Sequence, residues 1–336
     1  MRRALALAWR GNGRTSPRPR VGAIVVRGGK IIGEGYFAQS GADHAEIIAI
    51  RATRKRTRSL ADATLYVTLE PCSTHGRTPP CVTAIVREKF KRVVVAAIDP
   101  NPRHAGKGLK LLRRAGIQVA SGLLAVEATE MNRDFNHWIT TGRPWVTAKI
   151  AQSLDGRIKA PSGDDRWLTS PAARKAAHEL RAGANAIVIG AETARADNPH
   201  LTVRLPGRQA DAQPWRVVLT RSGKLPRGLN LFTDQHRKKT LIYKNMPVAD
   251  VLKRLAHRDV MNVLVEGGGY VLGEFFAAGL VNEVAFFVAP CILGAGPMAV
   301  EWPTTSPLKK RAALRRMEIE KAGPDFLCRA RVATRA

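Results

Sequence analysis

Short apolar runs alternate with amphipathic stretches along the whole of this chain. Runs typical of buried strands occupy residues 21–26, 30–36, 64–68, 92–98, 145–151, 186–190, 216–220, 240–243, 262–266 and 283–290. Patterns with helical spacing occupy residues 44–54, 80–89, 108–115, 171–181 and 270–278. Strands that alternate with helices indicate an α/β protein, in which helices cover a sheet.

The alternation breaks near residues 140–144, where the sequence reads TTGRP. A chain of 336 residues is long enough for two domains of roughly 100–200 residues each. We therefore expect one domain over residues 1–143 and a second over residues 144–336. Between the first two strands, Gly28-Gly29 predicts a tight hairpin turn.

Composition places the chain among ordinary globular proteins. Hydrophobic residues make up 45% and charged residues 24%, which excludes a disordered or fibrous chain. No apolar run approaches the ~18 residues of a membrane span, and the apolar patch in MRRALALAWRG is shorter than a secretory core. That opening segment predicts an amphipathic helix. Because neither a membrane span nor a secretory signal is recognised, we expect a cytoplasmic protein. The 4 cysteines are too few for a disulfide scaffold in a chain of this length.

Charge is the unusual feature, since 55 basic residues against 27 acidic ones give a net charge of +28. The excess is spread over both halves, whereas a nucleic-acid binder usually gathers its charge on one face or tail. The densest run, with five basic residues between Arg51 and Arg58, ends a predicted helix and is expected to be a solvated surface. A diffuse positive field attracts small phosphorylated molecules as well as RNA, so charge alone does not choose between them.

Four residues in the first half form a pattern with metal chemistry. His44 and Glu46 open a predicted helix, and Cys72 and Cys81 introduce the next one. One imidazole and two thiolates supply three zinc ligands and leave a fourth position for water, as in catalytic zinc sites. Glu46, two residues from His44, can approach the metal without ligating it and can carry a proton from water to a leaving amine.

The order of these residues is close to the H-x-E…P-C-x-x-C pattern of zinc nucleobase deaminases, except that eight residues separate the two cysteines. The alternative is that His44 is a buried core histidine, Glu46 a surface residue and the cysteines core thiols. His75, between the cysteines, is a further candidate for a ligand or a substrate contact.

The long cysteine spacing points to a family. The segment TLEPCSTHGRTPPC resembles that of the bifunctional riboflavin-biosynthesis deaminase–reductases of the RibD type, as do DPNPRHAGKG and AGIQV further along the chain. This resemblance implies a cytidine-deaminase-like α/β/α domain that hydrolytically deaminates 2,5-diamino-6-ribosylamino-4(3H)-pyrimidinone 5′-phosphate. It makes His44, Cys72 and Cys81 the zinc ligands and Glu46 the proton carrier.

One position departs from the family pattern N-P-x-V-G, in which the Asn side chain can hydrogen-bond the pyrimidine. Here the chain reads Arg18-Pro19-Arg20-Val21-Gly22. Arginine has donors only and cannot supply the acceptor of an Asn carbonyl. Either another group takes over base recognition while Arg18 points to solvent, or the first pocket accepts a different substrate.

The second half has a glycine-rich turn after an apolar strand, Glu266-Gly267-Gly268-Gly269, which is followed by a predicted helix. Glycines there let a phosphate approach the backbone, and the helix N-terminus supplies N–H donors. Such turns are also common without any function. Glu266 is more informative, because a buried carboxylate is costly without a partner, and a ribose or ribityl hydroxyl is a natural one.

Four segments of this half resemble the reductase half of the same family, at residues 148–158, 166–170, 179–204 and 264–294. The resemblance implies a dihydrofolate-reductase-like α/β domain that uses NADPH to reduce the ribosyl group to ribityl. Carried over position by position, the cofactor contacts are Ala151, Trp167, Thr193, Asp197, Gly267, Gly268, Gly269, Tyr270, Val271, Leu272 and Gly273. The substrate contacts are Asp165, where the family often has Ser, and Arg181, Leu201, Arg204 and Glu266.

Side-chain chemistry favours some of these contacts. Arg181 and Arg204 suit a phosphate clamp, because guanidinium groups bind phosphate oxygens in pairs. Arg221 follows a predicted strand, from which it can contact the 2′-phosphate of NADPH, although a surface arginine is equally expected in so basic a protein. Lys149 and Asp155 are candidates for orienting the sugar, while SLDG is also a good turn sequence.

Together these patterns predict a two-domain enzyme, with Zn²⁺ in the first half and NADPH in the second, that acts in sequence on a small phosphorylated pyrimidine. Two rival hypotheses stay open: a reductase whose deaminase half is inactive or repurposed, and a nucleic-acid deaminase attracted by the charge. The long cysteine spacing and the 6% of aromatic residues argue against the second rival. We expect no nucleic-acid or membrane partner, and the resemblance is compatible with a homo-oligomer.

Overall fold

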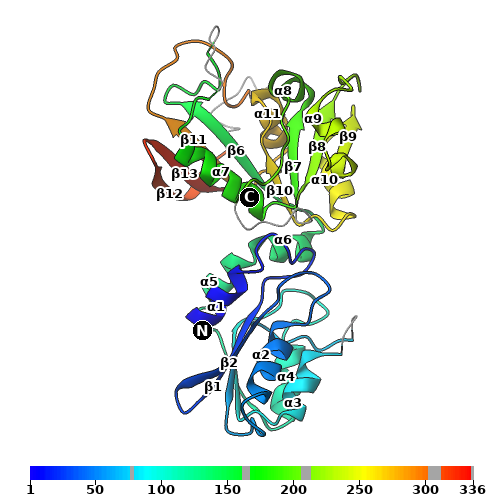
Figure 1. Cartoon of the computed structure of the whole chain (residues 1–336), viewed down its shortest axis with the longest axis vertical. Helices are drawn as coiled ribbons and strands as arrows, with labels where there is room; N and C mark the ends of the chain where they lie inside the picture. The colour runs from blue at the N-terminus through cyan, green and yellow to red at the C-terminus, as the bar shows by residue number, and fades with distance from the viewer. Residues whose placement is uncertain (76–78, 161–166, 206–212, 302–311, 334–336) are drawn as a thin grey trace. The chain divides into compact units, whose positions relative to one another are not determined.

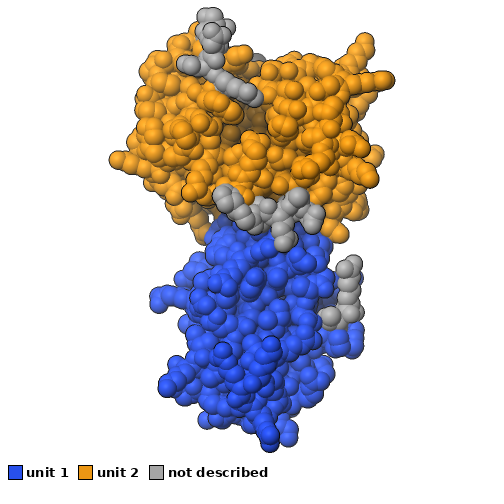
Figure 2. Space-filling view, viewed as in Figure 1, with its two compact units in different colours: residues 1–142 blue, residues 143–336 orange. Residues whose placement is uncertain are grey.

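The computed structural model describes residues 1–75, 79–160, 167–205, 213–301 and 312–333. The chain forms two compact units, Met1–Gly142 and Arg143–Ala336, which Figure 2 colours separately. Each unit is built on its own sheet flanked by helices, so the predicted α/β class is confirmed (Figure 1). Within the described ranges, none of the helices has both the length and the apolar character needed to span a bilayer.

Unit 1 is a mixed sheet with helices on both faces (Figure 1). Its strands, in sheet order, are β2 (Lys30–Tyr36), β1 (Gly22–Arg27), β3 (Thr64–Leu69), β4 (Arg92–Ala97) and β5 (Gln118–Ser121). β1 is antiparallel to β2 and β3, whereas β3, β4 and β5 run parallel. Its helices are α1 (Arg2–Trp9), α2 (Ala45–Arg54), α3 (Cys81–Arg87), α4 (Lys107–Arg114), α5 (Ala125–Met131) and α6 (Arg133–Thr141). The β1–β2 hairpin turns at Gly28 and Gly29, both with positive φ, as their sequence predicts.

Apolar side chains cover both faces of this sheet. On one face, Val25, Leu65 and Val93 pack beneath α2, α3 and α4. On the other face, Ile24 packs with α1, and Ala96 packs with Ala128 of α5. Because both faces are covered, the central strands read in the sequence as continuous apolar runs and not as alternating ones.

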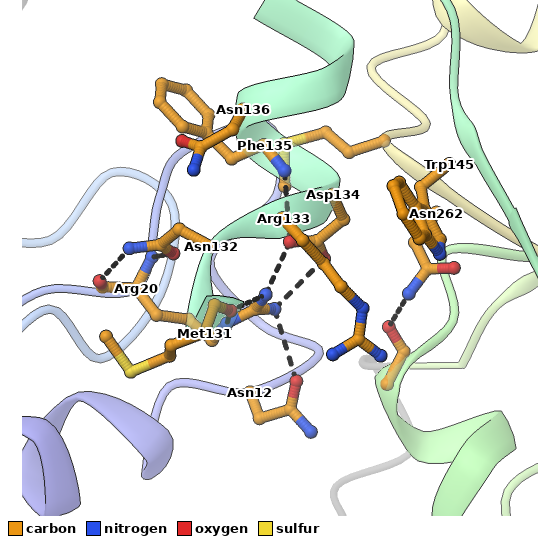
Figure 3. Close-up of polar contacts among 12 residues, drawn as sticks. Asn12, Arg20, Met131, Asn132, Arg133, Asp134, Phe135, Asn136, Trp145 and Asn262 are labelled. Carbon is orange, nitrogen blue, oxygen red and sulfur yellow. Dashed lines mark hydrogen bonds and ion pairs between the residues drawn. The ribbon is translucent and has the colours of Figure 1, made fainter. Parts of the chain in front are cut away.

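A buried ion pair ties the segment before β1 to the first turn of α6. The guanidinium of Arg20 contacts both carboxylate oxygens of Asp134 and donates to the carbonyl of Met131 (Figure 3). Asn132 exchanges hydrogen bonds of 2.8 and 2.9 Å with the backbone of Arg20. The side chains of Arg20 and Asp134 are only 7% and 5% exposed, so each relies on the other for its counter-charge.

Unit 2 is a larger sheet in which parallel strands dominate. In sheet order the strands are β12 (Leu314–Ala322), β13 (Asp325–Val332), β11 (Glu283–Ala289), β6 (Trp145–Ser153), β10 (Asn262–Val265), β7 (Ala186–Gly190), β8 (Trp215–Thr220) and β9 (Thr240–Lys244). The strands from β11 to β9 run parallel, and β13 and β12 add an antiparallel hairpin at one edge. The helices are α7 (Pro171–Gly183), α8 (Ala191–Asp197), α9 (Asn230–Thr233), α10 (Val248–Ala256) and α11 (Gly269–Ala277), with a 3₁₀ turn η2 at Arg237–Lys239.

The predicted strands and helices are confirmed, with ends that shift by a few residues. The sequence reading missed β5, α5, α6, α8, α10 and the β12–β13 hairpin, among others. α5 and α8 are short, and β12 reads LRRMEIEKA with almost every residue exposed, so neither kind of segment carries a clear apolar period. α10 does carry helical spacing in VADVLKRLA, so the sequence alone indicates this helix.

We predict that Asp134→Ala lowers the free energy of unfolding of unit 1 by about 3–5 kcal/mol, because it leaves the Arg20 charge buried without a partner. Urea unfolding followed by fluorescence measures this loss. Glu34→Ala, which removes the exposed ion pair between Glu34 and Arg3, is the matched control and changes the free energy far less. Equal losses in the two variants would contradict a structural role for the buried pair.

Candidate functional site

Three side chains of unit 1 converge to form a candidate metal centre. One ligand atom each from His44, Cys72 and Cys81 lies within 4.8 Å of the other two. The Sγ atom of Cys81 is 3.2 Å from Nδ1 of His44, and the Sγ atom of Cys72 is 3.6 Å from the same nitrogen. Two ligands of one tetrahedral Zn²⁺ are about 3.6 Å apart, so this donor set fits zinc.

The local fold explains this convergence. His44 is the N-cap of α2, Cys72 follows the carboxyl end of β3, and Cys81 is the first residue of α3. The backbone N–H of Cys81 donates to the sulfur of Cys72 over 3.2 Å. Hydrogen bonding from the side chain of Cys81, followed by that from the side chain of His44 and the backbone of Cys81, outweighs burial and lowers the pKa of Cys72 to about 4. The low pKa favours the thiolate that a metal requires.

Glu46 lies beside this centre on the first turn of α2. Its carboxyl group is hydrogen-bonded to Cys81, and the residue is 3% exposed. Burial, together with the charge of Cys72, raises the pKa of Glu46 to about 7. The alternative of a surface glutamate at this position is therefore wrong.

Two other residues singled out in the sequence lie near this region without joining the cluster. Among the described residues, the candidate metal-ligating group consists of His44, Cys72 and Cys81, and His75 is exposed and lies outside it. Arg18 is also exposed, but its positive charge is close enough to oppose protonation of His44.

A supporting carboxylate that sequence reasoning missed precedes the candidate metal ligand Cys72. Glu70 is 4% exposed, and it accepts backbone hydrogen bonds from Asp99, Gly106 and Gly108 over 2.8–3.2 Å. A Cβ atom on Gly108 would lie 2.4 Å from the carbonyl oxygen of Pro71, so only glycine fits there. Glu70 thus fixes the DPNPRHAGKG segment against the strand end that carries Cys72.

Unit 2 contains a cleft of about 2550 Å³ at the carboxyl ends of its parallel strands, and Figure 2 shows a hollow on this unit. The following predicted residues line it: Ala151, Trp167, Arg181, Thr193, Asp197, Leu201, Arg204, Arg221, Glu266, Gly268, Gly269, Tyr270 and Val271. Gly267, Leu272 and Gly273 are not lining residues, and Leu272 points into the hydrophobic core at 1% exposure. Asp165 lies outside the described residues.

A buried ionic cluster forms the floor of this cleft. The guanidinium of Arg181, on α7, holds both carboxylate oxygens of Glu266 at 2.6 and 2.8 Å. The Nζ atom of Lys149, on β6, lies 3.8 Å from the same carboxylate. Burial raises the pKa of Glu266, but the charges of Arg181 and then Lys149 more than reverse this effect and lower the pKa to about 2. Glu266 therefore has its counter-charges within the protein, in addition to any sugar hydroxyl.

The glycine turn before α11 contains two glycines with no room for a side chain and one that borders open space. A Cβ atom on Gly269 would lie 2.3 Å from the carbonyl oxygen of Met298, and one on Gly267 would lie 2.7 Å from Cβ of Val271, so both positions are closed by packing. At Gly268, in contrast, the nearest atom is Oγ1 of Thr193 at 3.7 Å. The turn is thus bare at Gly268, which faces the cleft and precedes the N–H groups of α11.

Side chains at the rim of the cleft are more exposed. The guanidinium of Arg221 stacks 4.6 Å from the ring centre of Tyr270 and donates to its hydroxyl group. Trp167 is 58% exposed, with the guanidinium of Arg174 5.0 Å from the centre of its ring system. These flat, paired groups suit contact with an aromatic or phosphate-bearing ligand.

The carboxylate of Asp155 accepts three hydrogen bonds from within the protein. It accepts hydrogen bonds from the hydroxyl of Ser153 at 2.6 Å and from the backbone N–H groups of Leu293 and Gly294. The Ser153 hydrogen bond is the main cause of the lowered pKa of Asp155, at about 2. This arrangement favours the turn-forming reading of SLDG.

Sequence reasoning also missed His178, which lines the same cleft. It lies three residues before Arg181 on α7, so the two side chains share a helix face. This three-residue spacing from Arg181 is the sequence signal that identifies His178 as a candidate cleft residue.

Comparison with known proteins gives concordant results for the two units. Residues 144–328 match the family model of the RibD C-terminal domain, and residues 1–97 match that of the cytidine and deoxycytidylate deaminase zinc-binding region. The chain is 39% identical to the riboflavin biosynthesis protein RibD of Aquifex aeolicus, over 97% of this chain and 96% of that protein.

Solved structures agree over almost the whole chain. RibD of Acinetobacter baumannii has a TM-score of 0.89 at 34% identity, covering 99% of this chain and 97% of that one. The same TM-score and coverage, at 35% identity, hold for a Thermotoga maritima protein described as a diaminohydroxyphosphoribosylaminopyrimidine deaminase/5-amino-6-(5-phosphoribosylamino)uracil reductase.

We predict that Glu266→Gln destabilises unit 2 at pH 7, because it leaves Arg181 and Lys149 without their buried counter-charge. Since the folded-state pKa of Glu266 lies at about 2, below its usual value near 4.5, its contribution is complete above about pH 4.5 and is lost as the pH falls towards 2. Urea unfolding at a series of pH values should give a difference of about 3 kcal/mol from the wild type at pH 7, narrowing below pH 4.5.

Glu179→Gln, on an exposed position of α7, is the control for this experiment and should differ little from the wild type at every pH. A pH-independent difference for Glu266→Gln would contradict the assignment of the charge.

Proposed function

The chain belongs to the RibD family of riboflavin biosynthesis proteins, and on this premise we propose which residues carry its two reactions. It is a bifunctional enzyme of the riboflavin pathway, with a zinc-dependent deaminase half and an NADPH-dependent reductase half. We propose that residues 1–143 deaminate 2,5-diamino-6-ribosylamino-4(3H)-pyrimidinone 5′-phosphate. Residues 144–336 then reduce its ribosyl group to ribityl, as the description of the Thermotoga maritima protein suggests.

In the deaminase half, His44, Cys72 and Cys81 would hold Zn²⁺, which supplies Lewis acidity at an open coordination position when it is bound. Glu46 takes a proton from the attacking water and delivers a proton to the leaving amine, so that ammonia departs and a carbonyl replaces the amino group. The contact between the Glu46 carboxyl and Cys81 supports this role, because it fixes the carboxyl beside the metal ligands without making it one.

In the reductase half, NADPH supplies the hydride when it is bound. The N–H groups at the start of α11 and the open space at Gly268 support binding of a phosphate of the cofactor. Arg221, paired with Tyr270 at the rim, recognises its 2′-phosphate. The proposed cofactor contacts that line the cleft are Ala151, Trp167, Thr193, Asp197, Arg221, Gly268, Gly269, Tyr270 and Val271.

The substrate is held on the other wall of the same cleft. Arg204 binds the 5′-phosphate, and Arg181, while it holds Glu266, keeps further N–H donors for the same group. Glu266 and Lys149 face the sugar, whose hydroxyl groups can donate to the carboxylate. Leu201 and Asp165 complete the proposed set.

The observation that carries the deaminase assignment is the three-ligand cluster with its adjacent buried carboxyl, since a closed structural site has four protein ligands. For partners, we propose a small phosphorylated pyrimidine and no nucleic acid or membrane, with the protein located in the cytoplasm. The net charge of +28 then serves to attract phosphorylated ligands.

We further propose a homo-oligomer that forms through β12. This strand lies at the edge of its sheet, and its residues from Leu314 to Lys321 are exposed, including Met317 at 61% and Ile319 at 63%. Its first half carries Arg315 and Arg316, and its second half carries Glu318 and Glu320. Antiparallel pairing of two copies sets basic halves against acidic halves and satisfies the edge N–H and C=O groups.

For the two reactions, we predict that the zinc-loaded enzyme releases ammonia from the diaminopyrimidine ribosyl phosphate without NADPH, and that the product gains two hydrogens in mass when NADPH is added. Glu46→Gln should reduce ammonia release at least ~100-fold, because a general acid–base contributes that much. The same variant should bind zinc and reduce the deaminated substrate at the wild-type rate. Ammonia detection and mass spectrometry measure both steps.

Two results would contradict this assignment. Deamination that survives in Glu46→Gln would exclude Glu46 as the proton carrier. Reduction without deamination by the zinc-loaded wild type would mean that Arg18 has changed what the first pocket accepts, and Arg18→Asn should then restore ammonia release.

For the oligomer, we predict that the wild type is at least a dimer in light scattering and that a Met317→Lys, Ile319→Lys double variant is a monomer, because the new charges repel across the paired edge. Leu111→Lys, at a 40% exposed apolar position on α4, is the control and should keep the wild-type mass. A monomeric wild type at micromolar concentration would exclude this interface.

A further inference from the structure

His178 is a titratable side chain in the reductase cleft that the two reactions do not yet use. It projects from α7 beside Arg181 and lines the cleft together with Arg204. Both of its ring nitrogens lie against Arg204. The backbone N–H of Arg204 points at Nδ1 over 3.4 Å, and Nη2 of its guanidinium lies 3.3 Å from Nε2.

These two contacts cannot both be hydrogen bonds. A neutral imidazole has one acceptor nitrogen and one N–H, and a protonated imidazole has no acceptor. Arg204 presents a donor to each nitrogen. The backbone N–H has a fixed direction, so we assign Nδ1 as its acceptor. Nε2 then carries the hydrogen, so its N–H group faces the N–H groups of the guanidinium and two donors oppose each other.

The imidazole of His178 is neutral at pH 7. Burial, together with the charges of Arg181 and Arg204, lowers the pKa of His178 to about 4. The other charged groups that face it are Glu266 and Lys149, and only Glu266 favours the protonated form. A neutral His178 adds no charge to the cleft, but it adds one N–H donor.

Among the residues that the structure describes, Arg204 is the cation of this cluster without a carboxylate within ion-pair distance. Arg181 and Lys149 both share Glu266, and the charge of Asp197 also reaches Lys149. Within the described part of the chain, the side chain of Arg204 contacts the hydroxyl of Thr202 and the ring of His178 and forms no ion pair. The cluster is therefore net positive at Arg204, next to two N–H donors only 3.3 Å apart.

We propose that His178 is a phosphate-binding residue of the reductase site, whose Nε2–H donates, together with the guanidinium of Arg204, to one oxygen of the substrate's 5′-phosphate. A phosphate oxygen only accepts hydrogen bonds, so it can accept from both His178 and Arg204. It also brings a negative charge next to the Arg204 guanidinium. Nδ1 at the same time fixes the backbone of Arg204. This inference rests on the proposed reductase function.

The test compares two substrates with the NADPH-loaded enzyme: the deaminated ribosylaminopyrimidine with its 5′-phosphate, and the same compound without the phosphate. We expect His178→Phe to raise KM for the phosphorylated substrate about tenfold or more, the usual effect of losing a hydrogen bond to a charged group. The kcat value and the KM for NADPH should change less than twofold. For the compound without phosphate, wild type and variant should have the same KM.

Two further variants separate binding from packing. His178→Gln keeps an acceptor oxygen and N–H donors and should recover most of the lost affinity. His257→Phe, at an exposed histidine of the same unit, is the matched control and should behave as the wild type does. If the phenylalanine ring prevents folding, His178→Ala replaces it in the same comparison.

The outcomes are distinct. A rise in KM that is equal for both substrates, or no rise at all, would overturn the role of His178 and leave the reductase function standing. A wild type that reduces neither substrate with NADPH would overturn the proposed function and this inference with it. A phosphate-dependent rise that Gln reverses would support both.

Discussion

Both candidate sites depend on one constraint: parallel strands place their carboxyl ends on the same edge of a sheet. In unit 1 this edge carries Cys72 after β3, with the first residues of α2 and α3 beside it. In unit 2 it carries Glu266 after β10 and Arg221 after β8. Residues far apart in the sequence thus meet because strand direction, and not local spacing, brings them together.

Buried charge is the second feature that the two units share, and it serves different ends. The Arg20–Asp134 pair holds a segment before the first strand against the last helices of unit 1. The cluster of Glu266, Arg181 and Lys149 lies in the cleft itself, so its charges can also meet a ligand. The Arg20–Asp134 pair thus fixes the position of a segment, whereas the Glu266 cluster fixes its own side chains and can also recognise a ligand. In both cases, removing the charges from water costs free energy that only good geometry offsets.

The parts of the site that motifs encode were predictable. His44, Glu46, Cys72 and Cys81 follow from short spacings around two helix starts, because zinc and proton transfer need those residue types at those places. Which side chains pair with one another across the fold was not predictable from the sequence. Arg181 and Glu266 are 85 residues apart, and nothing local links them. The same holds for His178 and Arg204, and for Glu70, whose backbone partners lie beyond the next strand.

The sequence by itself determined the α/β class, most strands and helices, and the candidate metal-ligand set, because apolar period and short motif spacing are properties of neighbouring residues. Only the tertiary structure decided which charges are paired, which glycines are closed by packing and which side chains line the cleft. Leu272 illustrates this: the family resemblance implies a cofactor contact for it, yet the turn of α11 directs its side chain into the core. Those outcomes depend on distances between helices and strands, and the order of residues along the chain does not specify these distances.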